Sequence, residues 1–369
     1  MRLASAIFVT AALNIAWGQS PDPAGSAELC GSCHRAILEA WKSSAHAKSM
    51  ESSSFQEGLQ QAEAELQGQA QATCLACHAP LAILSRDTDL RLKASWEGVT
   101  CNYCHSVRDV SMANGNPRAA VELSAVKRGP LRDARAPTHG TMFSAVHTSS
   151  LVCAPCHEHK NSLGFAVLTT YSEWSASRYA KEEKTCQSCH MYKVGGDVVD
   201  PKILKSSEAK VNLHQMPGSH SLEQLNKTVR ANLSATREKD RLKVTIEVTN
   251  REAGHYVPTG SPLRQLVLEL TIDAYDGRRF REERVYRRAV ADKDGKLINV
   301  EHEAFRKAAK VVSDTRLAPD EKRTEEFLFP VPAGVSAQMK ASFSYFFSPA
   351  PRSGIRERIT FLTIDRFVR

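Results

Sequence analysis

All ten cysteines of the 369-residue chain lie in five Cys-x-x-Cys-His motifs. This pattern is the attachment signal for c-type haem, because thiols spaced this way reach the vinyl groups on one porphyrin edge while the next imidazole binds iron. The motifs predict covalent attachment at Cys30, Cys33, Cys74, Cys77, Cys101, Cys104, Cys153, Cys156, Cys186 and Cys189. The proximal iron ligands predicted for the five haems are His34, His78, His105, His157 and His190.

Zinc sites and thioredoxin-like redox sites also use Cys-x-x-Cys pairs. Neither chemistry requires a histidine at the next position, whereas every pair in this chain has one. The sequence therefore favours five covalent c-type haems over zinc or disulfide chemistry.

The histidines outside the motifs bear on function, because each haem iron has a second axial position. Two imidazoles per iron suit electron transfer, whereas an open position indicates catalysis. We expect the distal ligands to come from six of these histidines, namely His46, His139, His147, His214, His220 and His255. His159 is expected to contact the surface or a propionate, and His302 to be solvated. Met142 and Met191 are alternative ligands.

One internal repeat bears on ligation. The segment from Trp41 to Lys48 aligns with that from Trp174 to Lys181, and His46 is replaced by Tyr179. Either one haem lacks the equivalent ligand and has a tyrosine nearby, or Tyr179 only packs and its haem takes a histidine from elsewhere.

The N-terminus has the pattern of a secretory signal peptide. Arg2 precedes a mostly apolar run over residues 3–17, and Ala16-Trp17-Gly18 resembles a cleavage site. We predict a signal peptide over residues 1–18, with a retained anchor as the alternative. The mature chain is expected to lack a transmembrane span and to be periplasmic or extracellular.

The composition of the chain and the pattern of its apolar residues change near residue 224. All motifs precede it, among segments of helical character, and residues 242–248 and 266–272 then alternate apolar and polar side chains as half-buried strands do. The fold class predicted is α+β. A mainly helical pentahaem domain over residues 19–224 is followed over 225–369 by an antiparallel β-sandwich of immunoglobulin size.

Charge divides in the same way. Residues 225–369 hold 28 Lys and Arg against 20 Asp and Glu, so this part carries the chain's whole net charge of +8. The arginines between 278 and 288 are a solvated strand face or a docking surface for a protein or membrane partner. Nucleic-acid binding is not expected of a secreted haem protein.

Several segments resemble bacterial multihaem cytochromes c. They are the first motif with residues 41–47, residues 98–105, the Glu173-Trp174 segment before the fifth motif, and the loop 254–260. The chain is similar here to the superfamily of the tetrahaem cytochrome of ammonia oxidisers, pentahaem nitrite reductase and hydroxylamine oxidoreductase. The resemblance implies haems stacked in close pairs. Ammonia-forming nitrite reductases typically replace one motif histidine with lysine, and hydroxylamine oxidoreductase has more haems, so neither activity transfers.

These observations predict a secreted cytochrome that relays electrons between redox partner proteins. Two alternatives remain. One is a reductase or oxidase of a small nitrogen or sulfur compound at a five-coordinate haem, and the other assigns the β-sandwich to docking.

Overall fold

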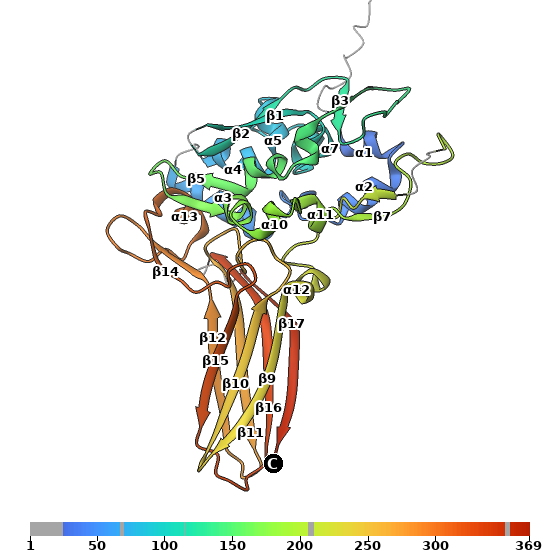
Figure 1. Ribbon diagram of the computed structural model, residues 1–369. Coiled ribbons are helices and arrows are strands. Elements are labelled where there is room, and N and C mark those ends of the chain that lie inside the picture. Colours follow the sequence, from blue (N-terminus) through green and yellow to red (C-terminus); the bar gives the residue numbers. More distant parts are fainter. Residues whose placement is uncertain (1–24, 67–69, 114, 206–209, 351–354) are drawn as a thin grey trace, which may run out of the picture.

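The computed structural model describes residues 25–66, 70–113, 115–205, 210–350 and 355–369. The predicted signal peptide lies outside the described residues. The chain forms a wide head of short helices and small sheets, residues 25–221, on an elongated β-sandwich (Figure 1). The α+β class is confirmed. No helix in the described part is long and apolar enough to span a membrane.

The helices of the head are short, and most of them border a haem-attachment motif. Helix α4 ends at His78, α7 spans Cys101–Cys104, and α11 spans Cys186–His190. The other helices of the head are α1 (Ala27–Gly31), α2 (Arg35–Lys42), α3 (Ser53–Leu66), α5 (Pro80–Leu84), α6 (Lys93–Trp96), η1 (Ala145–Thr148), η2 (Ser150–Cys153), α8 (Ala154–His157), α9 (Thr170–Ser175) and α10 (Arg178–Lys181); α4 begins at Ala70.

Small two-stranded sheets connect these helices, a feature that the sequence analysis does not anticipate. Their strands are β1 (Val107–Ala113), β2 (Asn116–Val121), β3 (Val126–Gly129), β4 (Gly140–Phe143), β5 (Glu158–Lys160), β6 (Ala166–Thr169), β7 (Lys193–Gly195) and β8 (Lys210–Asn212). The strand pair β3 and β4 is parallel, and the others are antiparallel. Helix α12 (Leu222–Thr228) joins the head to the sandwich.

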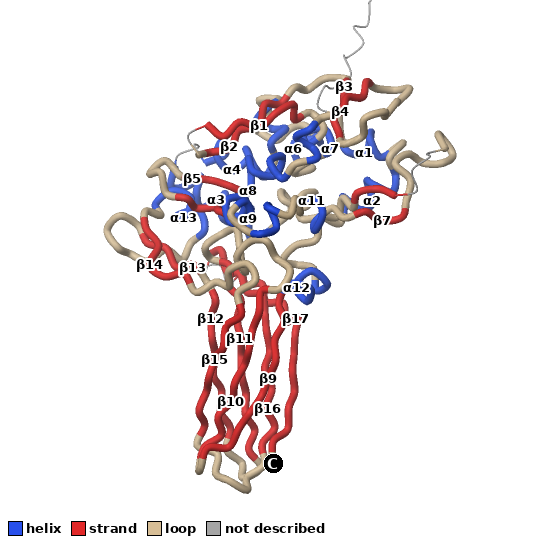
Figure 2. Tube along the Cα trace, in the orientation of Figure 1, coloured by secondary structure: helices blue, strands red, loops and turns tan. Residues whose placement is uncertain are grey.

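The sandwich consists of a three-stranded sheet in the order β15-β10-β9 and a four-stranded sheet in the order β12-β11-β16-β17. Its strands run along the long axis of the molecule (Figure 2) and are β9 (Val229–Glu238), β10 (Arg241–Asn250), β11 (Arg264–Ala274), β12 (Arg279–Tyr286), β15 (Lys322–Phe329), β16 (Ala337–Ala350) and β17 (Ile355–Val368). The predicted alternation along residues 242–248 is confirmed, because every second side chain is buried. These side chains and those of Leu266, Leu268, Leu270 and Ile272 form one core.

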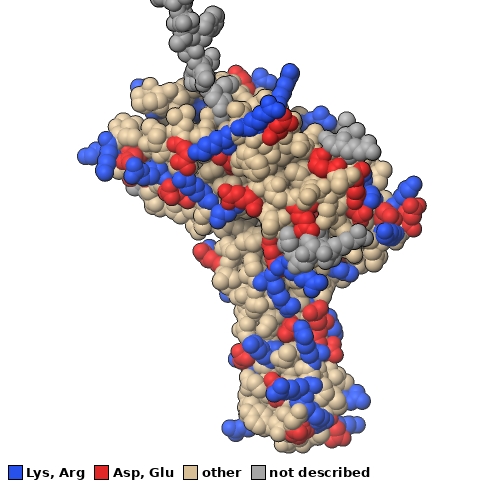
Figure 3. Space-filling view, turned by 180° about the vertical axis from the view of Figure 1, so that it is seen from behind, with Lys and Arg blue, Asp and Glu red and all other residues tan. Residues whose placement is uncertain are grey.

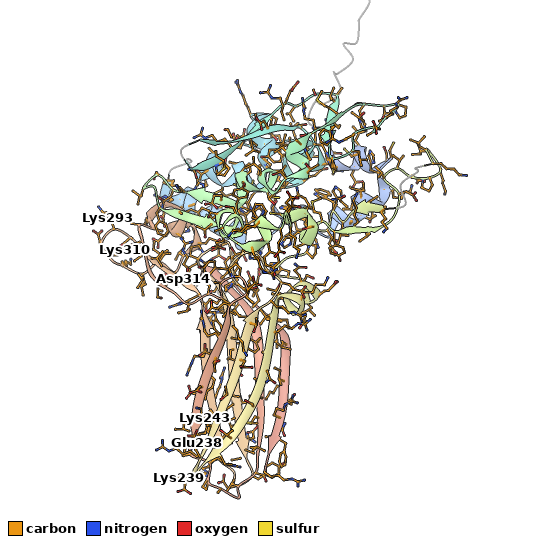
Figure 4. The ribbon with its side chains drawn as sticks, in the orientation of Figure 1. Glu238, Lys239, Lys243, Lys293, Lys310 and Asp314 are labelled. Atoms are coloured by element: carbon orange, nitrogen blue, oxygen red, sulfur yellow. The ribbon has the colours of Figure 1, made fainter. Side chains whose placement is uncertain are left out.

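An arm inserted between β12 and β15 returns to the head. It comprises β13 (Arg288–Ala291), α13 (Glu301–Lys307) and β14 (Lys310–Asp314). Val290, Ala304 and Ala308 of the arm pack on Val167 of the head in a separate small core. Figure 4 labels Lys293, Lys310 and Asp314 in this arm, and Glu238, Lys239 and Lys243 at the far end of the sandwich.

Four arginines of the basic stretch, at positions 278, 279, 281 and 284, pair with neighbouring carboxylates, whereas Arg288 is buried and donates to the backbone carbonyl oxygen of Ala166. Arg279 lies 3.0 Å from Asp273, and Arg284 lies 3.3 Å from Glu325. Figure 3 shows positive and negative side chains intermixed along the sandwich. Pairs of this exposed kind contribute little to stability and partly cancel the field of the cluster. The geometry favours a solvated strand face over a uniform positive surface.

Candidate haem-binding centre

Four pairs of histidine rings lie close together, and each pair joins a motif histidine to one outside the motifs. Their ring centres lie 6.2 Å apart for His34 and His139, 6.1 Å for His46 and His157, 6.4 Å for His105 and His214, and 6.3 Å for His190 and His255. Two imidazoles that bind one metal from opposite sides, with bonds of about 2 Å, have ring centres about 6 Å apart. The pairs therefore fit one iron each.

Hydrogen bonds orient most of these rings. The Nδ1 atoms of His34, His105 and His190 each lie 2.6 Å from a backbone carbonyl oxygen, which belongs to Val198, Arg128 and Pro217 respectively. His214, His139 and His255 make the same contact with Asn212, Gly140 and Tyr256 at 2.7 to 2.9 Å. A bond of this kind fixes the tautomer with Nε2 free to ligate, as in other metal-binding histidines.

The paired distal residues come from four separate parts of the chain. His46 follows α2, His139 precedes β4, and His214 follows β8. His255 lies in the loop after β10, so the sandwich side of the molecule supplies one ring. Burial lowers the pKa values of His46, His214 and His255, which favours the neutral imidazole that binds a metal.

The turn that holds His46 depends on Gly98. Gly98 has φ of +69°, and an added Cβ would clash with the His46 carbonyl oxygen and the Ser49 hydroxyl. We expect Gly98→Ala to lower the free energy of unfolding by about 1–3 kcal/mol, through strain at a positive φ and displacement of His46. The measurement is urea denaturation of the haem-loaded protein.

The matched control for this prediction is Gly58→Ala in α3, where nothing lies within 4 Å of the added Cβ. In a helix interior this change is expected to be neutral or to stabilise by up to about 1 kcal/mol. Equal stability of the Gly98→Ala variant and the wild type would contradict the packing argument.

His78 differs from the other motif histidines. Its ring stacks on Phe55 with ring centres 3.8 Å apart and an interplanar angle of 12°. Among the described residues, the His78 ring makes no ring contact with a second histidine, and its buried Nδ1 has no hydrogen-bond partner. Phe55 lies against the face of the imidazole and offers no ligand atom.

The remaining histidines are engaged elsewhere. His147 lies 5.8 Å from His105, but its Nε2 is 2.9 Å from the carbonyl oxygen of Cys104. The Nε2 of His220 lies 2.8 Å from a carboxylate oxygen of Glu357. His159 packs beside Phe305. The expectation that His302 is solvated is wrong, since only 9% of this residue is exposed and it contacts Glu65.

A polar cluster from the C-terminal half of the chain lies near His78. Burial, with a smaller contribution from the positive charge of Arg264, lowers the pKa of His78 to about 4. Burial raises the pKa values of Glu301 and Tyr345, and Arg264 opposes both shifts. The Nε atom of Arg264 is buried without a hydrogen-bond partner among the described residues. The cluster places a cationic, a phenolic and a carboxyl group within electrostatic reach of one another.

Thiol contacts between motifs give the order of the haem-attachment segments in space. Interaction with the thiol of Cys101 lowers the pKa of Cys30 to about 7. Interaction with Cys156 likewise lowers the pKa of Cys77, and interaction with Cys153 lowers that of Cys186. The same interactions and burial raise the pKa values of Cys153 and Cys156, with a smaller contribution from Cys104 of the third motif.

These contacts connect all five motifs. The first motif touches the third, the third lies near the fourth, and the fourth touches both the second and the fifth. The fourth motif is therefore the junction, and the second, which contains His78, is a branch from it.

Tyr179 packs and does not face an unpaired histidine. Its hydroxyl donates to the carbonyl oxygen of Arg251 over 2.8 Å, and only 6% of the residue is exposed. A Cβ on Gly254 would lie 3.0 Å from Tyr179 and 3.1 Å from Trp174. The loop that carries His255 thus lies flat on the second copy of the repeat.

Comparisons with known proteins agree with this description. Residues 29–106 match the model of the family described as cytochrome c554 and c-prime. The chain is similar to the crystal structure of a penta-heme cytochrome c552 from Thermochromatium tepidum, with a TM-score of 0.74 and 23% identity over 95% of this chain and 100% of that one. No match was found among the curated proteins.

Two further structures overlap 37% of the chain. They are a structural genomics target named SoR45, which is 12% identical over 84% of its own length with a TM-score of 0.19, and the putative ApaA protein from Bordetella pertussis, which is 13% identical over 89% with a TM-score of 0.20. These scores are too low to support an argument. The predicted resemblance is confirmed: the chain matches the cytochrome c554 and c-prime family over its first three haem-attachment motifs and has the fold of a multihaem cytochrome c over almost its whole length.

Proposed function

We propose that the protein is a secreted, periplasmic or extracellular electron-transfer cytochrome that holds five covalent c-type haems. The observation that carries the proposal is the set of four histidine pairs with ring centres 6.1 to 6.4 Å apart. When bound, the haems supply one-electron carriers, and two imidazoles per iron keep an iron low-spin and closed to substrates.

The residues assigned to each haem follow from these pairs. In chain order, the proposed axial ligands are His34 with His139, His78 alone, His105 with His214, His157 with His46, and His190 with His255. The ten motif cysteines form the thioether attachments. The electron donor and acceptor are redox proteins, and we assign the sandwich to haem ligation through His255 in preference to docking.

A second function is favoured by His78. Within the described ranges, four motif histidines have a second histidine ring about 6 Å away and His78 has none, while the surplus histidines contact other groups. A haem with one protein ligand can bind a small molecule at its iron. We therefore propose that the protein also reduces or oxidises a small nitrogen or sulfur compound there, with electrons that enter or leave through the fourth motif.

A pair of variants tests the ligand assignment. His214 and His147 both lie near His105, at 6.4 and 5.8 Å between ring centres, but His214 contacts a carbonyl oxygen through Nδ1 and His147 through Nε2. We expect His214→Ala to convert one haem from low-spin to high-spin in the electron paramagnetic resonance (EPR) spectrum of the oxidised protein, and His147→Ala to leave the spectrum unchanged. The reverse result would assign His147 as the ligand.

A further inference from the structure

The loop that carries His255 is held to the head by one carboxylate. Glu173, in α9, accepts hydrogen bonds from the backbone nitrogen of Tyr256 at 3.2 Å and from the hydroxyl of Thr259 at 2.7 Å. A second bond joins the hydroxyls of Thr259 and Thr170 at 2.9 Å. Two loop positions on the C-terminal side of His255 are thus fixed to the same short helix.

The other oxygen of Glu173 binds the arm of the sandwich part. Arg316 donates to it over 2.7 Å, and the two side chains are only 7% and 6% exposed. The Arg316 guanidinium also pairs with Asp314 at 2.8 Å and lies 4.6 Å from the ring centre of Tyr256. Asp314 is labelled in Figure 4, near the junction of head and sandwich. A buried charge is stable only when it is paired, so loss of Glu173 leaves Arg316 undercompensated.

The N-terminal side of the loop rests on the repeated segment. Gly254 approaches Trp174 and Tyr179 too closely for a larger side chain without displacement, and Tyr179 holds the Arg251 carbonyl oxygen. In the first copy of the repeat the residue equivalent to Tyr179 is His46, whose ring centre lies 6.1 Å from that of His157. The first copy therefore supplies a ligand at this position, whereas the second copy supplies a surface on which the loop packs.

We propose that Glu173 is a positioning residue that holds His255 opposite His190, so that axial ligation of the fifth haem depends on docking of the sandwich part onto α9. The inference rests on the proposed ligation of that haem by His190 and His255. Glu173 itself touches neither ring. Its role is to fix the backbone on one side of His255 while Tyr179 and Gly254 fix the other side.

The test is EPR of the oxidised, haem-loaded protein together with its melting temperature. We expect His255→Ala to add one high-spin haem per chain to the wild-type signal, and Glu173→Ala to add part or all of the same signal. Added imidazole should abolish the new signal in both variants. Glu173→Gln keeps an acceptor for Tyr256 and Thr259, so it should retain more of the low-spin signal than Glu173→Ala.

The matched control is Asp320→Asn. Asp320 pairs with Arg178 of α10 at 2.6 Å across the same junction, but the two side chains are 39% and 49% exposed, and Arg178 donates to Asp320, Glu182 and Tyr179 rather than to Tyr256 or Thr259. It should leave the spin states unchanged. A Glu173→Ala variant that melts earlier without a new high-spin signal would overturn the positioning role alone. No new signal in His255→Ala would overturn the ligand assignment on which it rests.

Discussion

Replacing Cys153 and Cys156 with serine is expected to remove more from the protein than one haem. The fourth motif lies beside the second and fifth motifs and near the third, since its cysteines shift the pKa values of Cys77 and Cys186 and respond to Cys104. Its haem site also takes a ligand, His46, from the turn after α2, because the His46 ring centre lies 6.1 Å from that of His157. Without this attachment, the second and fifth sites lose their common neighbour. We expect the variant to retain fewer haems per chain than the four that simple subtraction from five motifs predicts.

The control for the junction is the double substitution of Cys30 and Cys33 by serine. The first motif lies beside the third motif at one end of this arrangement, so its loss should remove one haem and leave the rest of the set. Intact mass and pyridine haemochrome absorbance measure the covalent haem content of soluble protein. Electron exchange between the third and fifth sites should be lost in the junction variant and kept in the control. Equal haem losses and equal exchange would contradict a central role for the fourth motif.

Removal of the charge of Arg264 is expected to have a second large effect, on the binding of anions. Burial is the main cause of the lowered pKa values of His78 and His157, and the charge of Arg264 adds to both shifts, so this cation acts on both sites. A half-buried cation near an open iron attracts an anion, and a unit-charge interaction over about 12 Å at an effective dielectric near 20 is worth about 1.4 kcal/mol, or about tenfold in affinity. We expect Arg264→Met to weaken azide binding to the ferric protein about tenfold or more, and to change binding of neutral imidazole little.

Arg284→Met is the control for this charge. Arg284 pairs with Glu325 on the surface of the sandwich, and its side chain is 39% exposed. Azide binding followed by optical titration should be unchanged in this variant. A similar loss of azide and imidazole binding in Arg264→Met would indicate a disturbed site and would contradict the electrostatic explanation.

The sequence was sufficient for the features that depend on local order. The five attachment motifs each need only five consecutive residues, and the alternation of Leu242 to Val248 reflects one face of one strand. The histidines opposite the motifs are a different case. His105 and His214 are separated by more than 100 positions, and their rings come together only in the folded head, where β8 pairs with β7 and His214 follows β8.

The same dependence on distant contacts separates the histidines that can bind iron from those that cannot. His147 and His220 looked as suitable as His139 and His214, yet their ring nitrogens contact the Cys104 carbonyl oxygen and Glu357, which are 43 and 137 positions away. Glu173, Arg264, Glu301 and Tyr345 were not singled out as site residues, since a lone polar residue near a strand end or a helix has no spacing signal. The arm was missed because its two strands are only four and five residues long.

The central claim is that four histidine pairs close four irons and that His78 leaves the fifth open. Low-temperature EPR of the oxidised protein, with five covalent haems established by mass, tests this claim directly. We expect low-spin signals for four haems and a high-spin ferric signal for one, which azide alters. Five low-spin haems would show that the His78 site has a second protein ligand and would leave electron transfer as the function. More than one high-spin haem would contradict the pairing of the histidines.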